Sequence, residues 1–488
     1  MGSTSIEGLE DPGVQLRGWW ERTRPVSRLH ARALARRWAE LPESARTPAQ
    51  LVGRHALGCE GTHGVFPKCN LTCSPCYHSH DANKVRVDGA HTVAEVDAQM
   101  TYLEETRGPH GHAQLIGGEV SLLDPDAHAE TLLAMRRHGR EPMSMTHGDF
   151  DDDYLASVVL GPDGRPRLPR VSFAGHFDSL MRGRRGVPRP RGEADLAPYR
   201  RQFVAMFRRL RSEHGVPSYL AHNMTVTPRN LPEVAEAVRT TVPMGFDMLS
   251  FQPAAFVGDD RRWREEFRAI TPDEVWAEVE RGMGTRLPWR ALQMGDPRCN
   301  RTAWGWLVDG RFVPALDDTD PRDLAMRDVF LERLGGLRVS GTPTRDLVVR
   351  LLRAAVAHPA LLPVGLGWLG RAVRRSGGWR AVRRARRTIR PITFVMHTFM
   401  DAAAVEPAWE LMERGVVAED PALLATQERL QACVYAMAHP ELGRVVPACV
   451  QHSVLDPGEN ERLRTLLPIV AVRPPGPADW TRRGRVPT

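Results

Sequence analysis

The sequence predicts an α/β protein built around a parallel β-sheet. From about Val65 to Phe251, short apolar runs of strand type alternate with longer stretches whose apolar residues recur at helical spacing. This alternation is typical of βα units, whose strands lie parallel in one sheet. The chain can also bury a large core, because it has 488 residues and 42% of them are hydrophobic, as in ordinary soluble proteins.

About six βα units are expected in order along the chain. The first strand should end near Phe66, and a helix should follow over 92–107, because Thr92 can cap it and apolar residues from Val93 to Leu103 share one face. The other strands are predicted over 114–116, 143–146, 170–173, 219–226 and 247–251, and the other helices near 126–138, 152–160, 196–213 and 231–241. In such sheets, ligands bind beyond the carboxyl ends of the strands.

Three cysteines follow the first predicted strand in a C-x3-C-x2-C pattern. They are Cys69, Cys73 and Cys76. A loop with this spacing can hold three corners of a [4Fe–4S] cluster and leave the fourth iron open for chemistry.

A structural zinc site is the alternative for the same loop. Zinc takes four ligands, and Cys59, His78 or His80 could supply the fourth. The protein would then be a zinc-stapled interaction protein rather than an enzyme.

The cysteine loop resembles the signature of the radical S-adenosylmethionine (SAM) superfamily. A second segment, Leu115-Ile116-Gly117-Gly118-Glu119, is similar to the Gly-Gly-Glu motif of that superfamily and falls at the end of the second predicted strand. The resemblance implies a partial (β/α)6 barrel and SAM chelated to the open iron. One electron from an external flavodoxin- or ferredoxin-type donor then cleaves SAM to a 5′-deoxyadenosyl radical, which abstracts hydrogen from the substrate. Gly117, Gly118 and Glu119 would seat SAM, because a Cβ on either glycine would block its approach.

The resemblance also suggests weaker SAM contacts on later strands. Ser172 lies where the ribose is usually held, and Asn223 lies where the adenosyl group is reached. Both could equally be ordinary polar strand residues. His147 stands where relatives often have asparagine, and Pro75 replaces the aromatic residue that usually precedes the third cysteine.

Four further cysteines are Cys59, Cys299, Cys433 and Cys449. Four is the number that saturates a second [4Fe–4S] cluster, and a hairpin is expected between Cys433 and Cys449. The alternative is that some are buried apolar thiols, which is the common state of free cysteine.

The C-terminal cysteine segment is similar to that of archaeal tetraether lipid synthases and their bacterial relatives. The residues concerned are Cys433-Val434-Tyr435, the run from Gly443 to Cys449, and Met396 to Asp401 upstream. This narrower resemblance implies radical chemistry on a lipid-like substrate. The first alternative keeps the radical chemistry and replaces the lipid with a peptide or a small metabolite.

Charge is concentrated in one place. The net charge is +7, and nine arginines with no acidic residue lie between Arg371 and Arg390, so the remainder of the chain sums to −2 (7 − 9). The preceding stretch, 354–370, is apolar except for His358 but is interrupted by two prolines. Together they predict an interfacial membrane contact; a core helix followed by a solvated basic face is equally compatible. No nucleic-acid partner is expected, because no reader motif accompanies the arginines.

Four regions are expected along the chain. They are an N-terminal helical extension (1–58), the core barrel (59–290), a linker with apolar and basic helices (291–390) and an α+β C-terminal domain that could hold the second cluster (391–488). The absence of a secretory signal pattern and the clustering of the cysteines predict a cytoplasmic protein, with membrane association through the arginine-rich stretch.

Overall fold

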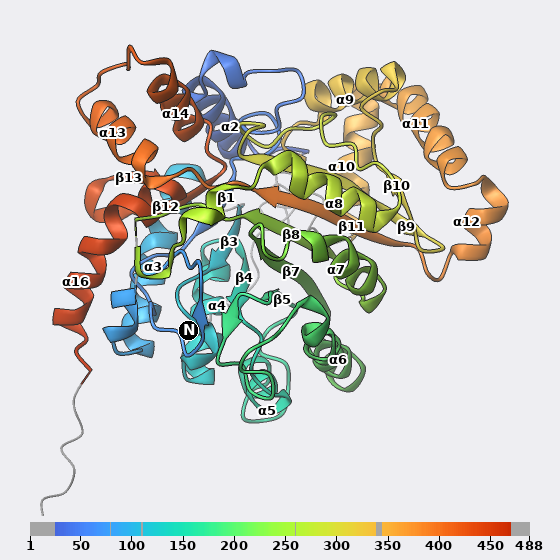
Figure 1. Ribbon diagram of the computed structural model, residues 1–488. Coiled ribbons are helices and arrows are strands. Elements are labelled where there is room, and N and C mark those ends of the chain that lie inside the picture. The colour runs from blue at the N-terminus through green and yellow to red at the C-terminus, as the bar shows by residue number, and fades with distance from the viewer. Residues whose placement is uncertain (1–24, 79, 109–110, 259, 338–343, 470–488) are drawn as a thin grey trace, which may run out of the picture.

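The computed structural model describes residues 25–78, 80–108, 111–258, 260–337 and 344–469. It confirms the predicted α/β class with a large parallel sheet. Eleven strands form one sheet in the order β10-β9-β11-β8-β7-β5-β4-β3-β1-β12-β13 (Figure 1). These strands are β1 (Cys59–Gly61), β3 (Gly111–Leu115), β4 (Arg140–Thr146), β5 (Val171–His176), β7 (Ser218–Val226), β8 (Met248–Pro253), β9 (Asn300–Val308), β10 (Arg311–Pro314), β11 (Arg390–His397), β12 (Tyr435–His439) and β13 (Arg444–Pro447).

The eight neighbouring strands from β11 to β12 are parallel. At one flank β9 runs antiparallel to β11 and β10 runs antiparallel to β9, and at the other flank β13 runs antiparallel to β12. Because parallel strands end at the same edge, the carboxyl ends of these eight strands meet there, where ligands are expected. A separate two-stranded ribbon joins β2 (Thr72–Cys73) to β6 (Met181–Arg182).

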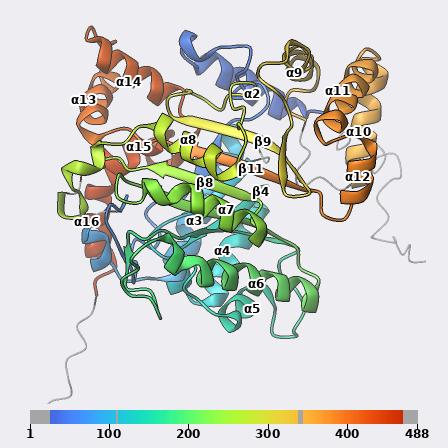
Figure 2. The same ribbon diagram turned by 45° about the vertical axis from the view of Figure 1, so that its right-hand side comes forward.

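Helices pack against this sheet and surround it. Figure 2 shows α4 to α7 along one side, with α10 to α12 and α13 to α14 at opposite ends of the molecule. The longer helices are α2 (Arg28–Glu40), α3 (Gly89–Arg107), α4 (Pro125–Arg137), α5 (Asp152–Val159), α6 (Ala197–His214), α7 (Val234–Thr241), α8 (Pro272–Met283), α9 (Pro321–Leu334), α10 (Thr344–Ala357), α11 (Leu361–Arg375), α12 (Trp379–Ala385), α13 (Ala402–Glu413), α14 (Pro421–Gln431) and α16 (Asp456–Leu466).

Five of the six predicted strands and all five predicted helices lie where they were expected, within a few residues. The first strand is an exception, because β1 ends at Gly61 rather than near Phe66. Val65 and Phe66 are fully buried but pair with no strand. These two residues are apolar because they belong to the core, and this led to the wrong prediction of a strand. The chain has left the sheet before them and leads into the cysteine loop.

The cap of α3 also differs from the prediction. Asp88 is the N-cap, and its Oδ1 accepts a hydrogen bond from the His91 backbone N–H at 3.0 Å. The Thr92 hydroxyl instead donates to the Asp88 carbonyl at 2.8 Å. Carboxylates cap as well as hydroxyls, so α3 starts three residues earlier than predicted.

The main core lies between the sheet and the helices of the βα units. On α6, Phe203 and Phe207 are one turn apart, with ring centroids 5.0 Å from each other, and Phe207 lies 5.0 Å from Phe173 of β5. Aromatic contacts of this kind stabilise beyond the area they bury. They hold α6 against the centre of the sheet and so fix the strands that line the site.

Strands from the C-terminal part of the chain extend both flanks of the sheet. On one flank β11 pairs with β8, and on the other β12 pairs with β1, followed by the β12–β13 hairpin predicted between Cys433 and Cys449. Residues beside β11 and β12 line one shared cavity, so the sheet curves until its two flanks face each other. The predicted region boundaries at 58, 290 and 390 stay predictions.

Candidate functional site

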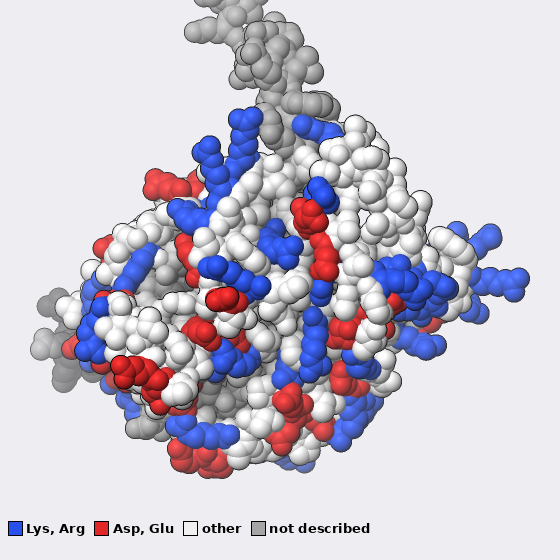
Figure 3. All heavy atoms as spheres, turned by 90° about the horizontal axis from the view of Figure 1, so that it is seen from above, with Lys and Arg blue, Asp and Glu red and all other residues white. Residues whose placement is uncertain are grey.

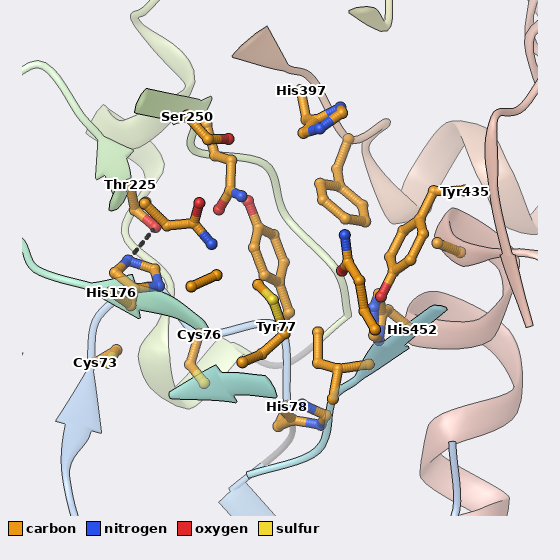
Figure 4. Close-up of a pocket in the computed structure, with 18 of the residues that line it drawn as sticks. Cys73, Cys76, Tyr77, His78, His176, Thr225, Ser250, His397, Tyr435 and His452 are labelled. Carbon is orange, nitrogen blue, oxygen red and sulfur yellow. Dashed lines mark hydrogen bonds between the residues drawn. The ribbon is translucent and has the colours of Figure 1, made fainter. Parts of the chain in front are cut away.

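A cavity of about 230 Å³ lies at the carboxyl edge of the parallel strands. All seven cysteines of the chain line it: Cys59, Cys69, Cys73, Cys76, Cys299, Cys433 and Cys449. None is in a disulfide. Figure 4 shows Tyr77 in the middle of this cavity, with His176 and Thr225 on one side and Tyr435 and His452 on the other.

The loop that carries Cys69, Cys73 and Cys76 is held by hydrogen bonds and by strand pairing. The Cys69 N–H donates to Asn83 Oδ1 at 2.8 Å, and Cys73 belongs to the ribbon that pairs with Met181 and Arg182. Next to it, Ser74 Oγ donates to the Arg262 carbonyl at 2.8 Å. The three thiols are therefore presented from a fixed loop rather than from a loose one.

Burial makes Cys69 and Cys73 poor acids. It raises the pKa of Cys69 to about 12, and it raises the pKa of Cys73 well above its usual value, with Cys76 and Cys69 raising it further. A metal ligand must be a thiolate, so these two thiols need a strongly cationic group beside them to ionise. An iron–sulfur cluster is such a group, and the donor set fits it.

A single metal ion fits these residues less well. Within the described part of the chain, no three histidine, cysteine or carboxylate side chains are placed to hold one ion. Zinc would need its sulfur ligands about 2.3 Å from a common centre. In a [4Fe–4S] cube each cysteine binds a different iron, so its ligands need not converge on one point. The zinc alternative finds no support in this geometry.

The two glycines of the Gly-Gly-Glu segment lie against the cysteine loop. A Cβ on Gly118 would stand 2.1 Å from the Lys68 carbonyl oxygen, and one on Gly117 would stand 2.8 Å from the Phe66 ring. The Gly118 N–H donates to the Phe66 carbonyl at 2.7 Å, and the Glu119 N–H donates to the Lys68 carbonyl at 2.9 Å. Glycine is therefore needed at both positions so that the backbone of this segment can pair closely with the backbone of the cysteine loop. This reason differs from the predicted approach of SAM.

Glu119 is fully buried and joins the ends of β3 and β4. Its Oε1 accepts from Thr146 Oγ1 and Ser121 Oγ, both at 2.6 Å, and its Oε2 accepts from the His147 N–H at 2.8 Å. These bonds occupy both carboxylate oxygens, so Glu119 shapes the rim of the cavity. The direct SAM contacts predicted for Gly117, Gly118 and Glu119 stay predictions.

His147 fastens the rim to the cysteine loop. Its Nδ1 accepts from the Asp149 N–H at 3.0 Å, so the ring proton lies on Nε2, which donates to Asn70 Oδ1 at 2.7 Å. Burial lowers the pKa of His147, which favours this neutral form. Asn70 directly follows Cys69. Through this hydrogen bond His147 therefore orients the cysteine loop.

The polar residues predicted on the later strands have different positions. Asn223 is buried and lines the cavity, whereas Ser172 does not line it. On the same face of β5, four residues further on, His176 does line it, and its Nε2 contacts Thr225 Oγ1 at 3.2 Å (Figure 4) and Asp178 Oδ2 at 2.5 Å. Sequence reasoning missed His176, although strand alternation from Ser172 puts it at the carboxyl end of the same face.

Two arginines line the cavity, and neither was predicted. Arg262 lies beside the Cys69–Cys76 loop, where its charge lowers the pKa of Cys69 and Cys73 against the larger effect of burial. Arg429 lies beside the other cysteines, and its Nε donates to Cys299 Sγ at 3.1 Å. Each end of the cavity therefore has one guanidinium next to thiols.

The remaining cysteines gather at the other end of the cavity. The Met400 N–H donates to Cys449 Sγ at 3.4 Å, and Cys59 pairs in the sheet with Tyr435, two residues after Cys433. Burial raises the pKa of Cys59 and of Cys299 to about 11. Burial also raises the pKa of Cys449, and the neighbouring Cys433 and Cys299 raise it further. The structure thus brings Cys59 and Cys299 to the same cavity as Cys433 and Cys449, which flank the β12–β13 hairpin more than a hundred residues further along the chain.

Aromatic rings and a histidine that contacts an aspartate also line the cavity. The Tyr77 ring lies 4.4 Å from Phe399 and 6.0 Å from His452, between centroids. His452 Nδ1 contacts Asp456 Oδ2 at 2.8 Å. Within the described residues, the buried hydroxyls of Tyr77 and Tyr435 have no hydrogen-bond partner, so each can bind a polar group placed in the cavity.

No family model matches the sequence, and no curated protein matches it. Solved structures with partial similarity include Streptococcus suis SuiB bound to S-adenosylmethionine, at 12% identity and a TM-score of 0.28 over 41% of each chain. SuiB bound to the precursor peptide SuiA has 11% identity and a TM-score of 0.29, over 52% of this chain and 47% of that one. The structure of anSMEcpe with bound AdoMet and Cp18Cys peptide has 13% identity and a TM-score of 0.32, over 45% of this chain and 57% of the other. The matched region thus spans about half the length of these proteins.

Proposed function

We propose that this protein is a radical SAM enzyme. Cys69, Cys73 and Cys76 would hold a [4Fe–4S] cluster at the carboxyl edge of a partial (β/α)6 barrel formed by β1, β3, β4, β5, β7 and β8. One observation carries the proposal: three free thiols, presented by one fixed loop, face a cavity at the edge where parallel sheets bind ligands. When bound, the cluster supplies the electron that cleaves SAM to methionine and a 5′-deoxyadenosyl radical.

The chain's own residues would bind and orient SAM beside this loop. Arg262 offers a guanidinium for the SAM carboxylate, and carboxylates are the preferred partners of arginine. The rim at Gly117 and Gly118 brings backbone close to the loop, and Asn223 offers an amide deeper in the cavity. The electron would come from an external flavodoxin- or ferredoxin-type protein in the cytoplasm.

Anaerobic reconstitution with iron and sulfide tests this proposal. The protein should turn brown and bind about four irons at this loop, and with a strong reductant and SAM it should release 5′-deoxyadenosine. A colourless protein that binds zinc and leaves SAM intact would overturn the proposal.

Replacing Arg262 with glutamine should weaken SAM binding. Loss of a charge-assisted hydrogen bond should raise the KM for SAM about tenfold or more while changing kcat less. The matched control is Arg264→Gln, since Arg264 is exposed and contacts Glu266 outside the cavity. Equal KM values for the two variants would remove Arg262 from the SAM site.

We extend the proposal to a second [4Fe–4S] cluster at the other end of the same cavity. Cys299, Cys433 and Cys449 would be its ligands, with Cys59 as the fourth. Support comes from their convergence from three distant segments, around Cys59, around Cys299 and around the β12–β13 hairpin, and from Arg429, which can stabilise thiolate charge beside Cys299.

The iron content of variants tests the second cluster. The wild type should hold about eight irons per chain and Cys433→Ala/Cys449→Ala about four, because the second site then keeps only two thiols. The double variant should still cleave SAM, which separates this outcome from failure of the first site. A wild type with about four irons, unchanged in the double variant, would refute the second cluster and leave the first.

For the substrate, we propose a hydrophobic, lipid-like molecule. Five flexible methionines line the cavity, which suits an apolar chain of variable shape: Met143, Met145, Met181, Met248 and Met400. The alternative is a peptide or a small metabolite. Deuterium transfer into 5′-deoxyadenosine from a deuterated lipid extract, but not from a deuterated peptide digest, would separate the two.

A further inference from the structure

Helices α10 and α11 expose an unusual amount of apolar surface. Of the sixteen large hydrophobic side chains that are exposed in the described residues, eight lie between 348 and 379. Val356 is 84% exposed, Leu366 is 68% exposed and Leu352 is 60% exposed. Single exposed leucines are ordinary, but such a concentration marks an interaction surface.

On each helix the exposed residues form a stripe. Val348, Leu352 and Val356 are spaced by four along α10, with Leu351 beside them, and Leu362, Leu366 and Leu369 follow at four and three along α11. This is the spacing with which an amphipathic helix faces a core. Here the stripes face outward.

The inner face of α11 is fixed to the protein body, so its stripe cannot turn inward. Trp368 Nε1 donates to the Ala315 carbonyl at 2.8 Å. Asp323, which is fully buried, accepts from Arg371 Nε at 2.7 Å and from Arg375 Nη1 at 2.6 Å. A buried carboxylate with two guanidinium partners is costly to separate, and it keeps α11 in this orientation.

These contacts correct the basic patch predicted over Arg371 to Arg390. Arg371 and Arg375 neutralise Asp323, and Arg390 Nη1 donates to the Phe246 carbonyl at 2.6 Å. The arginines on the surface are the other six: Arg374, Arg380, Arg383, Arg384, Arg386 and Arg387. Figure 3 shows basic side chains gathered at the right-hand edge of the molecule, the side on which α11 and α12 lie in Figure 1.

The two helices do not form a straight span. No single helix in the described ranges combines the length and the apolar character needed to cross a bilayer. The pair Arg345–Ala357 and Leu361–Arg375 passes that test only when joined, and its members are bent by 120°. Such a bent pair is suited to lying along a surface, with its stripes shallowly inserted.

We propose that α10, α11 and α12 form a docking surface for an anionic lipid bilayer. The leucine and valine stripes enter the acyl boundary, Trp379 sits at the interface, and the six surface arginines bind lipid phosphates. Charge favours a membrane as the occupant, because among the described residues the only ion pair of these six arginines joins Arg384 Nε to Asp309 Oδ2, at 4.0 Å. The inference stands apart from the proposed chemistry, because no cavity residue takes part in it.

Vesicle co-sedimentation of the full-length protein tests the proposal. The wild type should sediment with vesicles of phosphatidylcholine and phosphatidylglycerol, and less with phosphatidylcholine alone. The double variant Leu352→Glu/Leu366→Glu should bind at least about tenfold more weakly. So should Arg383→Gln/Arg386→Gln/Arg387→Gln, whose residual binding should depend less on salt.

The matched control is Val417→Glu, because Val417 is 71% exposed but lies between α13 and α14. It should bind vesicles like the wild type, and circular dichroism should show that all variants are folded. A wild-type protein that does not sediment with anionic vesicles would overturn the proposal. So would a dimer, measured by light scattering, that Leu352→Glu/Leu366→Glu converts to monomer without changing vesicle binding, because the stripes would then serve a second copy of the chain.

Discussion

Cys73→Ala should abolish both the brown iron–sulfur colour at the first site and the release of 5′-deoxyadenosine. The variant removes one of three thiols, and a cube held by only two cysteines is not expected to survive purification. The loop itself should keep its position, because the ribbon between β2 and β6 is made by backbone groups. We expect a fall in the rate of SAM cleavage to the uncatalysed background, measured by chromatography of anaerobic reactions.

The control for this experiment is Thr72→Ala. Thr72 is the exposed neighbour of Cys73 in the same ribbon and does not line the cavity. It should retain cluster and activity. Release of 5′-deoxyadenosine by Cys73→Ala at the rate of Thr72→Ala would show that the ligands have been assigned wrongly.

Gly118→Ala should be the most disruptive single-methyl change in the site. The added Cβ would stand 2.1 Å from the Lys68 carbonyl oxygen, so the Gly-Gly-Glu segment and the cysteine loop must separate. Separation strains the site and breaks the bonds from the Gly118 and Glu119 N–H groups. We expect the free energy of unfolding to fall by about 3 kcal/mol, as measured in urea, and the iron content after reconstitution to fall with it.

Gly458→Ala is the matched control for that substitution. Gly458 lies on the exposed side of α16, and a Cβ there meets nothing within 4 Å. Because alanine is the better helix former, the control should be neutral or more stable by up to about 1 kcal/mol. If Gly118→Ala unfolded like this control and bound full iron, the close pairing of rim and loop would not matter.

The sequence was sufficient for the central βα units because their signals are local. Each strand and its following helix are neighbours in the chain, and periodicity over ten or so residues identifies them. The positions of β11 and β12 could not be predicted in this way. They pair with β8 and β1, which lie far away in the sequence, and no local pattern records such a partner.

In the site, too, residues with a local sequence signal could be predicted and residues brought in by tertiary structure could not. Spacing alone singled out Cys69, Cys73 and Cys76 as proposed cluster ligands, because the three lie in one short loop. Arg262 and His452 reach the cavity only through tertiary structure, and nothing beside them in the sequence marks them. Similarly, the pairing of Arg371 and Arg375 with Asp323 depends on how α11 packs on α9, so the predicted basic patch was larger than the real one.

The position of β1 between β3 and β12 has a consequence for biosynthesis. The ribosome delivers the N-terminal part of a chain first. The edge of β1 that later pairs with β12 therefore stays without a strand partner until residues 435–439 emerge. An unpaired strand edge promotes association between nascent chains. The part of the cavity lining that carries Cys433 and Cys449 also folds last, so the cluster proposed for the Cys69–Cys76 loop could be delivered before the cavity closes.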